Sequence, residues 1–554
     1  MSEQSRKKTS GFVIQAGILA LSGIIVRIIG LLYRSPLTSI IGDEGNGYYS
    51  YAYNIYAIIL LISSYSIPSA LSKVLAQRLT FKEYRNAHRV FQCALIYVVV
   101  VGGGASLVAF FAAPYLVGTN SVRVLRVFAP TIFLSGLVGV LRGYFQAYGS
   151  MVQTSISQIL EQIINAVVSV GAAWYLIAHV AGTGADDTTR AIYGAMGGAL
   201  GTGAGVVTAL LFMLWVYMLN MPGMKRRISR DSREEESRKE IFRVILSIVT
   251  PFILSTFIYN LSTSLNQTIY ERFYTTVKGM AESEVATLYG IYSGKAVVIS
   301  NIPIAMASAM CSAVIPTVAA SFARGEKKET RRNVKKAVKV TMLIAIPCAV
   351  GLCVLAKPVT QLLFWQKNSL DTASNVLAAL SVTVIFYCLS TLTNGVLQGI
   401  GKVTVPVIHA AIALVLQTGT LALLLYFTDF NLYALVIAAI VYSLSMCVMN
   451  QLAVRKYLKY KQEIFRTFWL PFMSAAIMGA VAWLVYQGVS MLAGFVLAEG
   501  SYLRNLIAAG VAILVAVIVY AFCVIRFKAV TKEELLAMPK GTAIVRAAQK
   551  LHLL

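Results

Sequence analysis

The chain has 554 residues, of which 58% are hydrophobic and only 13% are charged, with a formal net charge of +25. This composition excludes a soluble globular domain and is typical of an integral membrane protein. The charge does not predict nucleic-acid binding, because Lys and Arg are split over short segments between apolar runs, where they favour contact with anionic membrane lipids.

Apolar runs long enough to cross a hydrocarbon core of about 30 Å recur along the whole chain. Each run must be helical, since unpaired backbone groups are too costly in lipid. The sequence therefore predicts an all-α polytopic membrane protein with about fourteen transmembrane helices. In chain order they cover residues 11–33, 48–70, 90–113, 126–148, 155–178, 191–218, 243–268, 286–310, 338–356, 374–398, 403–427, 432–454, 468–490 and 503–525.

The basic residues between the runs predict the orientation of the chain in the membrane. Lys and Arg gather in alternate connections, at 73–89, 225–243, 324–339 and 455–466, and again from Arg526 onward. Cytoplasmic loops carry an excess of Lys and Arg, so these connections and both termini are predicted to be cytoplasmic.

Two short motifs occur twice, which indicates an internal duplication. Gly-Val-Leu-Arg-Gly at 139–143 matches Gly-Val-Leu-Gln-Gly at 395–399, and Ile-Pro-Ser at 67–69 matches Ile-Pro-Thr at 315–317. We therefore expect two six-helix lobes, spans 1–6 and 7–12, around a central cavity, as in alternating-access transporters. The predicted divisions are an N-terminal lobe at 1–220, a basic cytoplasmic linker at 221–240, a C-terminal lobe at 241–455, two appended helices at 456–530 and a cytoplasmic tail at 531–554.

Four charged residues lie inside the apolar runs: Arg27, Arg142, Glu161 and Lys295. A charge at bilayer depth costs roughly 2.5–3.5 kcal/mol, so such residues usually face a protein interior or a wet cavity and are functional. Three of the four are cations, which favours an anionic ligand.

Arg27 and Arg34 lie on one stripe of the first span, and Lys295 enters the eighth span to a similar depth as Arg27. Facing each other across a central cavity, such cations suit a diphosphate, which an arginine binds as a fork and a lysine as a point charge. Two alternatives stay open. Arg34 at the outer interface is also compatible with snorkelling to lipid headgroups, and Lys295 with a structural contact between helices.

Arg142 and Glu161 lie in the cytoplasmic halves of adjacent spans, which predicts either a structural ion pair or a site that couples transport to Na⁺ or H⁺. Further polar residues recur at helical spacing in two spans. They either line the cavity or bond between helices, and they are Gln158, Gln162 and Asn165 in span five and Asn260 and Gln267 in span seven.

Several segments together resemble the polysaccharide-transporter branch of the MOP exporter superfamily, close to the MurJ and SpoVB-like proteins of Gram-positive bacteria. They are Arg-Ile-Ile-Gly-Leu-Leu-Tyr-Arg at 27–34, Ile-Pro-Ser-Ala-Leu-Ser-Lys at 67–73, Arg-Gly-Tyr-Phe-Gln at 142–146, Ser-Gln-Ile-Leu-Glu-Gln at 157–162 and Ile-Pro-Thr-Val-Ala-Ala-Ser-Phe-Ala-Arg-Gly at 315–325. The resemblance implies a flippase for lipid II, the undecaprenyl-diphosphate-linked precursor of peptidoglycan. It also implies that Arg27 and Arg34 match the family's first-span arginine pair and that Lys295 stands where the family has a cavity arginine.

The expected function is therefore transport of a lipid-linked oligosaccharide across a bacterial cell membrane by alternating access, as a monomer that works beside the cell-wall synthesis machinery. No enzyme activity is predicted, because the outer loops are short and offer no large site for carboxylates or metal ligands. No metal site is predicted, because the four His are scattered, and no cofactor is expected. The sequence has no P-loop, so the chain is not expected to hydrolyse nucleotide itself. The driving force is then Na⁺ or H⁺ coupling or the membrane potential. The alternatives are a MATE-like cation-coupled multidrug antiporter and a flippase for another polysaccharide precursor.

Overall fold

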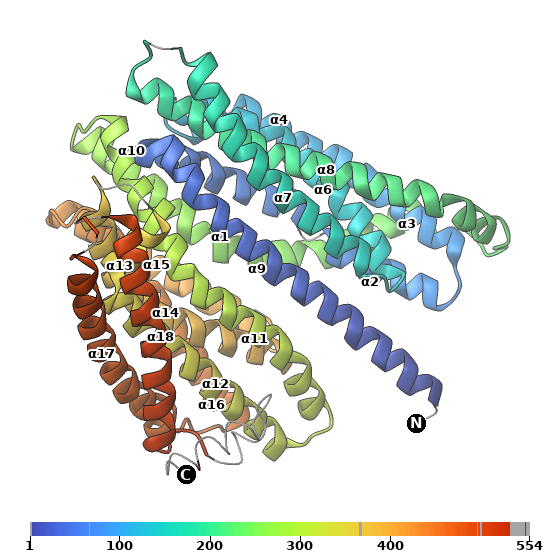
Figure 1. Ribbon diagram of the computed structural model, residues 1–554. Coiled ribbons are helices and arrows are strands. Elements are labelled where there is room, and N and C mark those ends of the chain that lie inside the picture. Colours follow the sequence, from blue (N-terminus) through green and yellow to red (C-terminus); the bar gives the residue numbers. More distant parts are fainter. Residues whose placement is uncertain are drawn as a thin grey trace. The chain divides into compact units, whose positions relative to one another are not determined.

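The computed structural model describes residues 3–531 apart from 66, 183, 365–367, 496, 499 and 500, together with residue 549 (Figure 1). Nearly all of the described residues are helical, and no strand occurs among them. The chain divides into two compact units, Met1–Gly290 and Ile291–Leu554, each of which has its own core. The predicted tail at 532–548 and 550–554 lies outside the described residues.

Among its described residues, the first unit contains ten α-helices with short π- and 3₁₀-helical segments between them. The α-helices are α1 (Glu3–Leu60), α2 (Ile67–Thr80), α3 (Tyr84–Tyr97), α4 (Gly103–Phe111), α5 (Ala113–Leu116), α6 (Val122–Ala147), α7 (Val152–Tyr175), α8 (Asp187–Ser229), α9 (Arg238–Arg272) and α10 (Glu282–Ile291), the last of which ends one residue into the second unit. A 3₁₀-helix, Thr119–Ser121, leads directly into α6.

The second unit begins with a π-helical segment, Tyr292–Ala296, and continues with eight α-helices among the described residues. These are α11 (Val297–Ala323), α12 (Lys327–Val354), α13 (Ala356–Leu363), α14 (Leu370–Gly399), α15 (Thr404–Phe427), α16 (Leu432–Leu458), α17 (Leu470–Ala493) and α18 (Tyr502–Arg526).

Eleven helices of the described part are long and apolar enough to cross a membrane. The predicted all-helical membrane fold is therefore confirmed, while the number fourteen stays a prediction. One reason for the difference is α1, because a single apolar stretch, Leu21–Ser64, contains parts of two predicted spans. Gly42 separates these parts with a left-handed φ of 72°, a conformation that glycine adopts without steric cost.

The two parts of α1 pack against different helices of the first unit. Before Gly42, α1 follows α7, where a Cβ atom at Gly30 would lie 3.3 Å from the side-chain nitrogen of Gln162. After Gly42 it follows α6, where the rings of Tyr56 and Phe128 stack with their centroids 4.8 Å apart. The part of α1 before Gly42 therefore forms one wall of a space inside the first unit, and the part after Gly42 forms a second wall.

The duplicated motifs make the same kind of contact in each unit. A Cβ atom at Gly143 would lie 2.8 Å from the carbonyl oxygen of Pro68, and one at Gly399 would lie 3.3 Å from the carbonyl oxygen of Ile315. In both units the glycine therefore lets a neighbouring backbone approach closely. The predicted lobe boundary at 221–240 stays a prediction, since α9 packs with α1, α2 and α3 in the first unit.

The glycines of α8 allow close packing against α7. Added Cβ atoms would overlap the backbone of Ala173 at Gly197 and the backbone and hydroxyl of Ser169 at Gly201. One turn further, a Cβ atom at Gly205 would lie 2.5 Å from a carbonyl oxygen of α7. Small residues at a helix interface let two backbones come together, as the Gly-xxx-Gly spacing predicts.

Replacing Gly201 by Val is expected to destabilise the first unit by about 3 kcal/mol or more, because α7 has no space for the added side chain. Gly171 provides the control, since nothing lies within 4 Å of an added Cβ atom there. Gly171→Ala should keep or slightly raise stability, as Ala favours a helix by about 1 kcal/mol over Gly. Thermal unfolding of the two purified variants in detergent compares them, and equal midpoints would contradict this packing.

Ion pairs fix the predicted cytoplasmic linker to the connection between α2 and α3. Arg78 holds Glu236 through two hydrogen bonds of 2.8 and 3.1 Å, and Arg89 lies 2.8 Å from Glu235. The second half of this segment, residues 231–240, has more acidic than basic residues, whereas the first half, residues 221–230, has only basic ones. Partly exposed ion pairs such as these contribute little alone, but several together favour one conformation of this connection.

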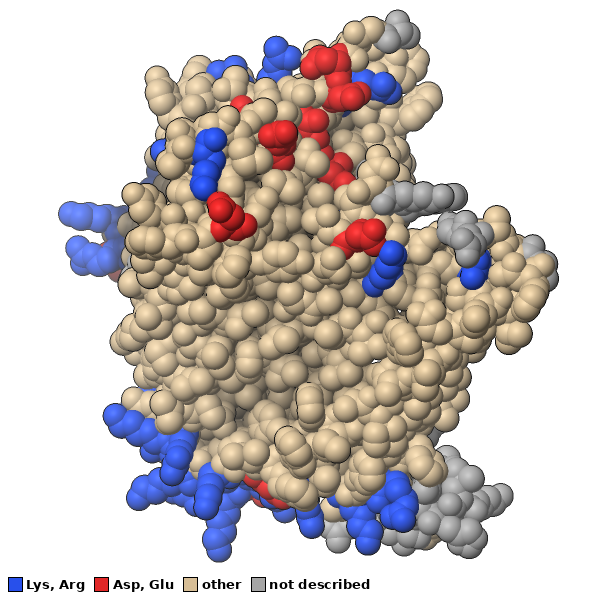
Figure 2. Space-filling view, turned by 90° about the vertical axis from the view of Figure 1, so that its left-hand side faces the viewer, with Lys and Arg blue, Asp and Glu red and all other residues tan. Residues whose placement is uncertain are grey.

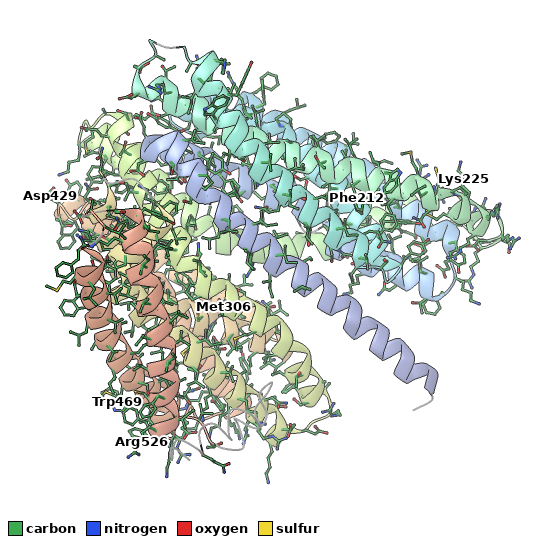
Figure 3. The ribbon with its side chains drawn as sticks, in the orientation of Figure 1. Phe212, Lys225, Met306, Asp429, Trp469 and Arg526 are labelled. Atoms are coloured by element: carbon green, nitrogen blue, oxygen red, sulfur yellow. The ribbon has the colours of Figure 1, made fainter. Side chains whose placement is uncertain are left out.

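The appended helices α17 and α18 form an antiparallel pair, with Trp469 and Arg526 at one end of the second unit and Asp429 at the opposite end (Figure 3). The side-chain amide of Asn505 donates to the carbonyl oxygen of Pro358 at 3.0 Å and joins α18 to α13. Large apolar side chains such as Trp483 remain exposed on these helices. On the face shown in Figure 2, Lys and Arg gather at the bottom of the view, and Asp and Glu with some Lys and Arg gather toward the top. The surface between them is largely uncharged, as expected for a surface in contact with lipid.

Candidate functional site

A cavity of about 620 Å³ lies within the first unit, between both parts of α1 and helices α2, α6, α7 and α8. Its wall is polar and aromatic rather than aliphatic. It is lined by Tyr33, Arg34, Tyr49, Tyr53, Tyr56, Ser64, Ser135, Arg142, Gln146, Gln158, Glu161, Gln162, Asn165 and Thr202, with a few apolar residues. Six residues predicted for a site from the sequence therefore share one cavity.

Arg34 places a cation on this wall, and no ion pair neutralises it within the described part of the chain. Its guanidinium carbon lies 5.1 Å from the centre of the Tyr49 ring, a favourable cation–π distance. Its Nη1 atom is buried and makes no hydrogen bond to the described residues. A buried polar group without a partner is costly, so this nitrogen is suited to bind an anion that enters the cavity.

Arg142 and Glu161 form the predicted ion pair. Nη2 of Arg142 lies 2.6 Å from a carboxylate oxygen of Glu161, and its Nε donates to the hydroxyl oxygen of Ser157 at 2.8 Å. The side chains are 15% and 30% exposed, so the pair faces the cavity rather than a sealed core. The two charges of this pair largely cancel. Arg34 is then the cation that makes the net charge of the cavity wall positive.

Three predicted amides complete one side of the cavity on α7. Gln158 accepts a weak hydrogen bond from Ser22 at 3.5 Å, and Asn165 accepts one from Ser169 at 2.9 Å. Gln162 faces Gly30 of α1. Since each amide has both donors and acceptors, this side can bind sugar hydroxyls and peptide groups.

Other predicted residues do not line this cavity. Arg27 is exposed on α1, between the contacts that Ser22 and Gly30 make with α7. Lys295 belongs to the second unit, where it is only 1% exposed and its Nζ donates to the hydroxyl of Ser369 at 2.6 Å. The predicted clamp of Arg27 and Lys295 stays a prediction.

The polar residues of span seven have different surroundings. Gln267 is buried, accepts a hydrogen bond from Asn54 and donates to the carbonyl oxygen of Tyr51 at 3.2 Å, so it joins α9 to α1. Asn260 is exposed on α9. Of the two readings open for Gln267, the structure shows the bond between helices.

Sequence reasoning missed the aromatic face of the cavity. Tyr49, Tyr53 and Tyr56 follow the spacing i, i+4 and i+7, which places them on one side of a helix. The rings of Tyr49 and Tyr53 stack with centroids 5.8 Å apart. The spacing was the available signal, but a stripe of aromatic residues in an apolar run more often packs in a core.

A helical membrane protein with duplicated motifs and a polar cavity inside one unit has the architecture of a transporter. Solved structures of this class have the same fold. An inward-facing multidrug resistance MATE family transporter of the MOP superfamily aligns with a TM-score of 0.61 at 19% identity, over 79% of this chain and 98% of that one. Lipid II flippase MurJ in an inward closed conformation aligns with a TM-score of 0.62 at 13% identity, over 91% and 98%.

The sequence places the chain within this class. The model of the family described as "Lipid II flippase MurJ" matches residues 84–507, so the chain belongs to the MurJ family. It is 24% identical to lipid II flippase MurJ of Bacillus subtilis (strain 168) over 422 residues, which cover 72% of this chain and 75% of that protein. It is 22% identical to stage V sporulation protein B of the same organism over 540 residues, covering 96% and 98%.

The predicted family, the assignment as a transporter rather than an enzyme, and the location in a bacterial cell membrane as a multi-pass protein are therefore confirmed. The family supports a flippase for a lipid-linked precursor. The fold alone does not separate this function from drug export, because MATE transporters share it.

Proposed function

We propose that the protein moves lipid II from the inner to the outer leaflet of the cell membrane by alternating access. The observation that carries this proposal is the position of Arg34, a cation on a polar cavity wall with a buried nitrogen that has no hydrogen-bond partner in the described chain. Lipid II combines a diphosphate with sugars and a peptide, and the cavity offers groups that match each of these parts.

Arg34 binds the diphosphate, since a guanidinium matches phosphate oxygens as a planar fork. The amides of Gln158, Gln162 and Asn165 bind the sugars, and the prenyl tail stays in lipid. The volume of about 620 Å³ is within the usual range for small-molecule sites, which suits part of a headgroup rather than the whole lipid. Arg27 and Lys295 are further cations proposed for the diphosphate, and Asn260 is proposed to contact the headgroup.

The energy for transport is proposed to come from the membrane potential or from an Na⁺ or H⁺ gradient, without a cofactor. The protein is proposed to act as a monomer that receives its substrate from the cell-wall synthesis machinery.

Two alternatives are weaker. Glu161 would suit a MATE-like exporter of cations, but its pairing with Arg142 removes the free negative charge that a cationic drug requires. Another lipid-linked polysaccharide precursor shares the diphosphate, so only identification of the accumulated lipid separates it from lipid II.

Depletion of the protein in its native host tests the substrate. Lipid II is expected to accumulate in the cytoplasmic leaflet, where added enzymes that act from outside do not reach it, and re-expression should restore access. Accumulation of a different undecaprenyl-diphosphate intermediate would contradict lipid II as the substrate. Unchanged amounts of all such lipids would contradict a flippase function.

A further inference from the structure

The beginning of α6 receives two carboxylates from the connection between α9 and α10. Glu271, in the last turn of α9, is only 7% exposed and accepts the backbone N–H of Gly118. Glu282, in the first turn of α10, accepts the backbone N–H of Asn120 at 3.0 Å. A Cβ atom at Gly118 would lie 2.5 Å from one carboxylate oxygen and 2.6 Å from the other, so the two side chains meet at one point.

The groups around this Glu271–Glu282 pair compensate its charge only in part. Neither carboxylate forms an ion pair in the described part of the chain; Arg272, next to Glu271, is exposed, and its charge lowers the pKa of Glu271. The phenols of Tyr51 on α1 and Tyr289 on α10 also face Glu271. On the side of Glu282, the amide of Asn120 donates to Tyr48 at 2.8 Å, and the Tyr48 hydroxyl donates to Glu44 at 2.9 Å.

The N-terminus of a helix carries the equivalent of about half a positive charge because of the helix dipole. This is too little to compensate the negative charges of two carboxylates at the same place. Carboxylates that share a site therefore hold a proton at higher pH than isolated ones. Burial and the neighbouring Glu282 raise the pKa of Glu271 to about 7, from an ordinary value of 4.5, although the Gly118 N–H and the charge of Arg272 oppose the shift. Burial also raises the pKa of Glu282.

The same α10 packs tightly on α1. An added Cβ atom at Gly47 would overlap the carbonyl oxygen of Ala286, and one at Gly290 would overlap the carbonyl oxygen of Asp43. Packed protein interiors have little free space, so even a small separation of the two helices would break this close backbone contact. Docking of α10 is therefore expected to switch between two states rather than to weaken gradually.

We propose that the Glu271–Glu282 pair is a pH-sensitive latch that keeps α10 docked on α1 and α6 when it has bound one proton and weakens docking when that proton leaves. By the predicted orientation, the latch faces the outside of the cell. Because the chain passes from α10 into the second unit at Ile291, the latch acts on the connection between the units. This inference goes beyond the proposed function and does not depend on the identity of the lipid.

The direction of the pH effect follows from proton linkage. The pKa of Glu271 is raised when α10 is docked, so the docked form binds more protons than an open form in which water surrounds the carboxylate. Docking is strongest below the ordinary pKa of 4.5 and weakens as the pH rises through about 7. Within this range the ratio of docked to open protein changes by up to about tenfold per pH unit.

Hydrogen exchange of the full-length protein in nanodiscs between pH 5.5 and 8.5 tests the latch. Protection factors of the backbone at 118–121 and 282–290, corrected for the intrinsic pH dependence of exchange, are expected to fall several-fold as the pH rises through 7. Glu271→Gln, which keeps the shape but stays neutral, should hold high protection at every pH. Glu282→Gln should shift the fall to lower pH, because it removes the like charge beside Glu271.

Glu284→Gln is the matched control, since Glu284 lies on the same turn of α10 but is exposed. This variant should follow the wild-type profile. The proposed latch is contradicted if the hydrogen-exchange protection of the wild type is independent of pH, or if Glu271→Gln retains the pH profile of the wild type. Since the measurement needs no substrate, a failure of lipid II as substrate leaves this result unaffected.

Discussion

Arg34→Ala is expected to abolish transport while the protein remains folded and inserted. The side chain provides a cation of the cavity that has no ion-pair partner in the described part of the chain, and its buried Nη1 makes no hydrogen bond there. Each hydrogen bond to a charged group contributes about 1.5–3 kcal/mol, which corresponds to roughly a tenfold to hundredfold loss of affinity. Complementation of a depleted strain, together with binding of purified lipid II, measures the effect.

Two further variants separate charge from geometry. Arg34→Lys keeps the cation but loses the planar fork, so it should retain partial activity. Arg126→Ala is the matched control, because Arg126 also lies over an aromatic ring, that of Phe110 at 5.5 Å, but is exposed and outside the cavity. It should behave like the wild type. A well-expressed Arg34→Ala protein that supports normal growth would exclude the proposed role.

The helices were the most predictable part of the fold, because long apolar runs in a membrane protein have few alternatives to a helix. The residues at which the helices end were less predictable. Gly42 is one glycine among forty, and nothing in its neighbours marks it as the residue at which α1 changes direction. Its role follows from the helices packed on either side, which depend on residues far away in the chain.

The Arg142–Glu161 pair was predictable because both residues lie within a few turns of the short connection between α6 and α7. Local connection makes two helices neighbours, so opposite charges at similar depth find each other. Lys295 had no such constraint, since its partner Ser369 lies 74 residues further on. Only packing between distant helices determines that contact.

The Glu271–Glu282 pair shows a different limit of prediction from the sequence. Both residues lie outside the predicted spans, where single acidic residues are usually solvated. Their significance depends on Gly118, more than 150 residues earlier, because a larger residue there would occupy the place where the carboxylates meet. The sequence contains the three residues but no periodicity that connects them.

Arg142→Ala is expected to impair transport strongly, and a second substitution, Glu161→Gln, is expected to restore part of it. Removing Arg142 alone leaves the carboxylate of Glu161 unpaired on the wall of the cavity that receives a diphosphate. Loss of one partner of a fully buried pair costs about 3–5 kcal/mol, and the partial exposure of this pair lowers that figure. The negative charge also repels the substrate, so binding should fall by more than tenfold.

In the double variant, the glutamine that replaces Glu161 carries no charge, which removes both the unpaired carboxylate and the repulsion. Glu161→Gln alone should be mild, because it frees the guanidinium of Arg142 to contact the diphosphate. Stability and lipid II binding of the four proteins give a coupling energy for the pair. If the double variant is as defective as Arg142→Ala, Arg142 itself binds the substrate. If it recovers, Arg142 serves to neutralise Glu161, and Arg34 carries the binding.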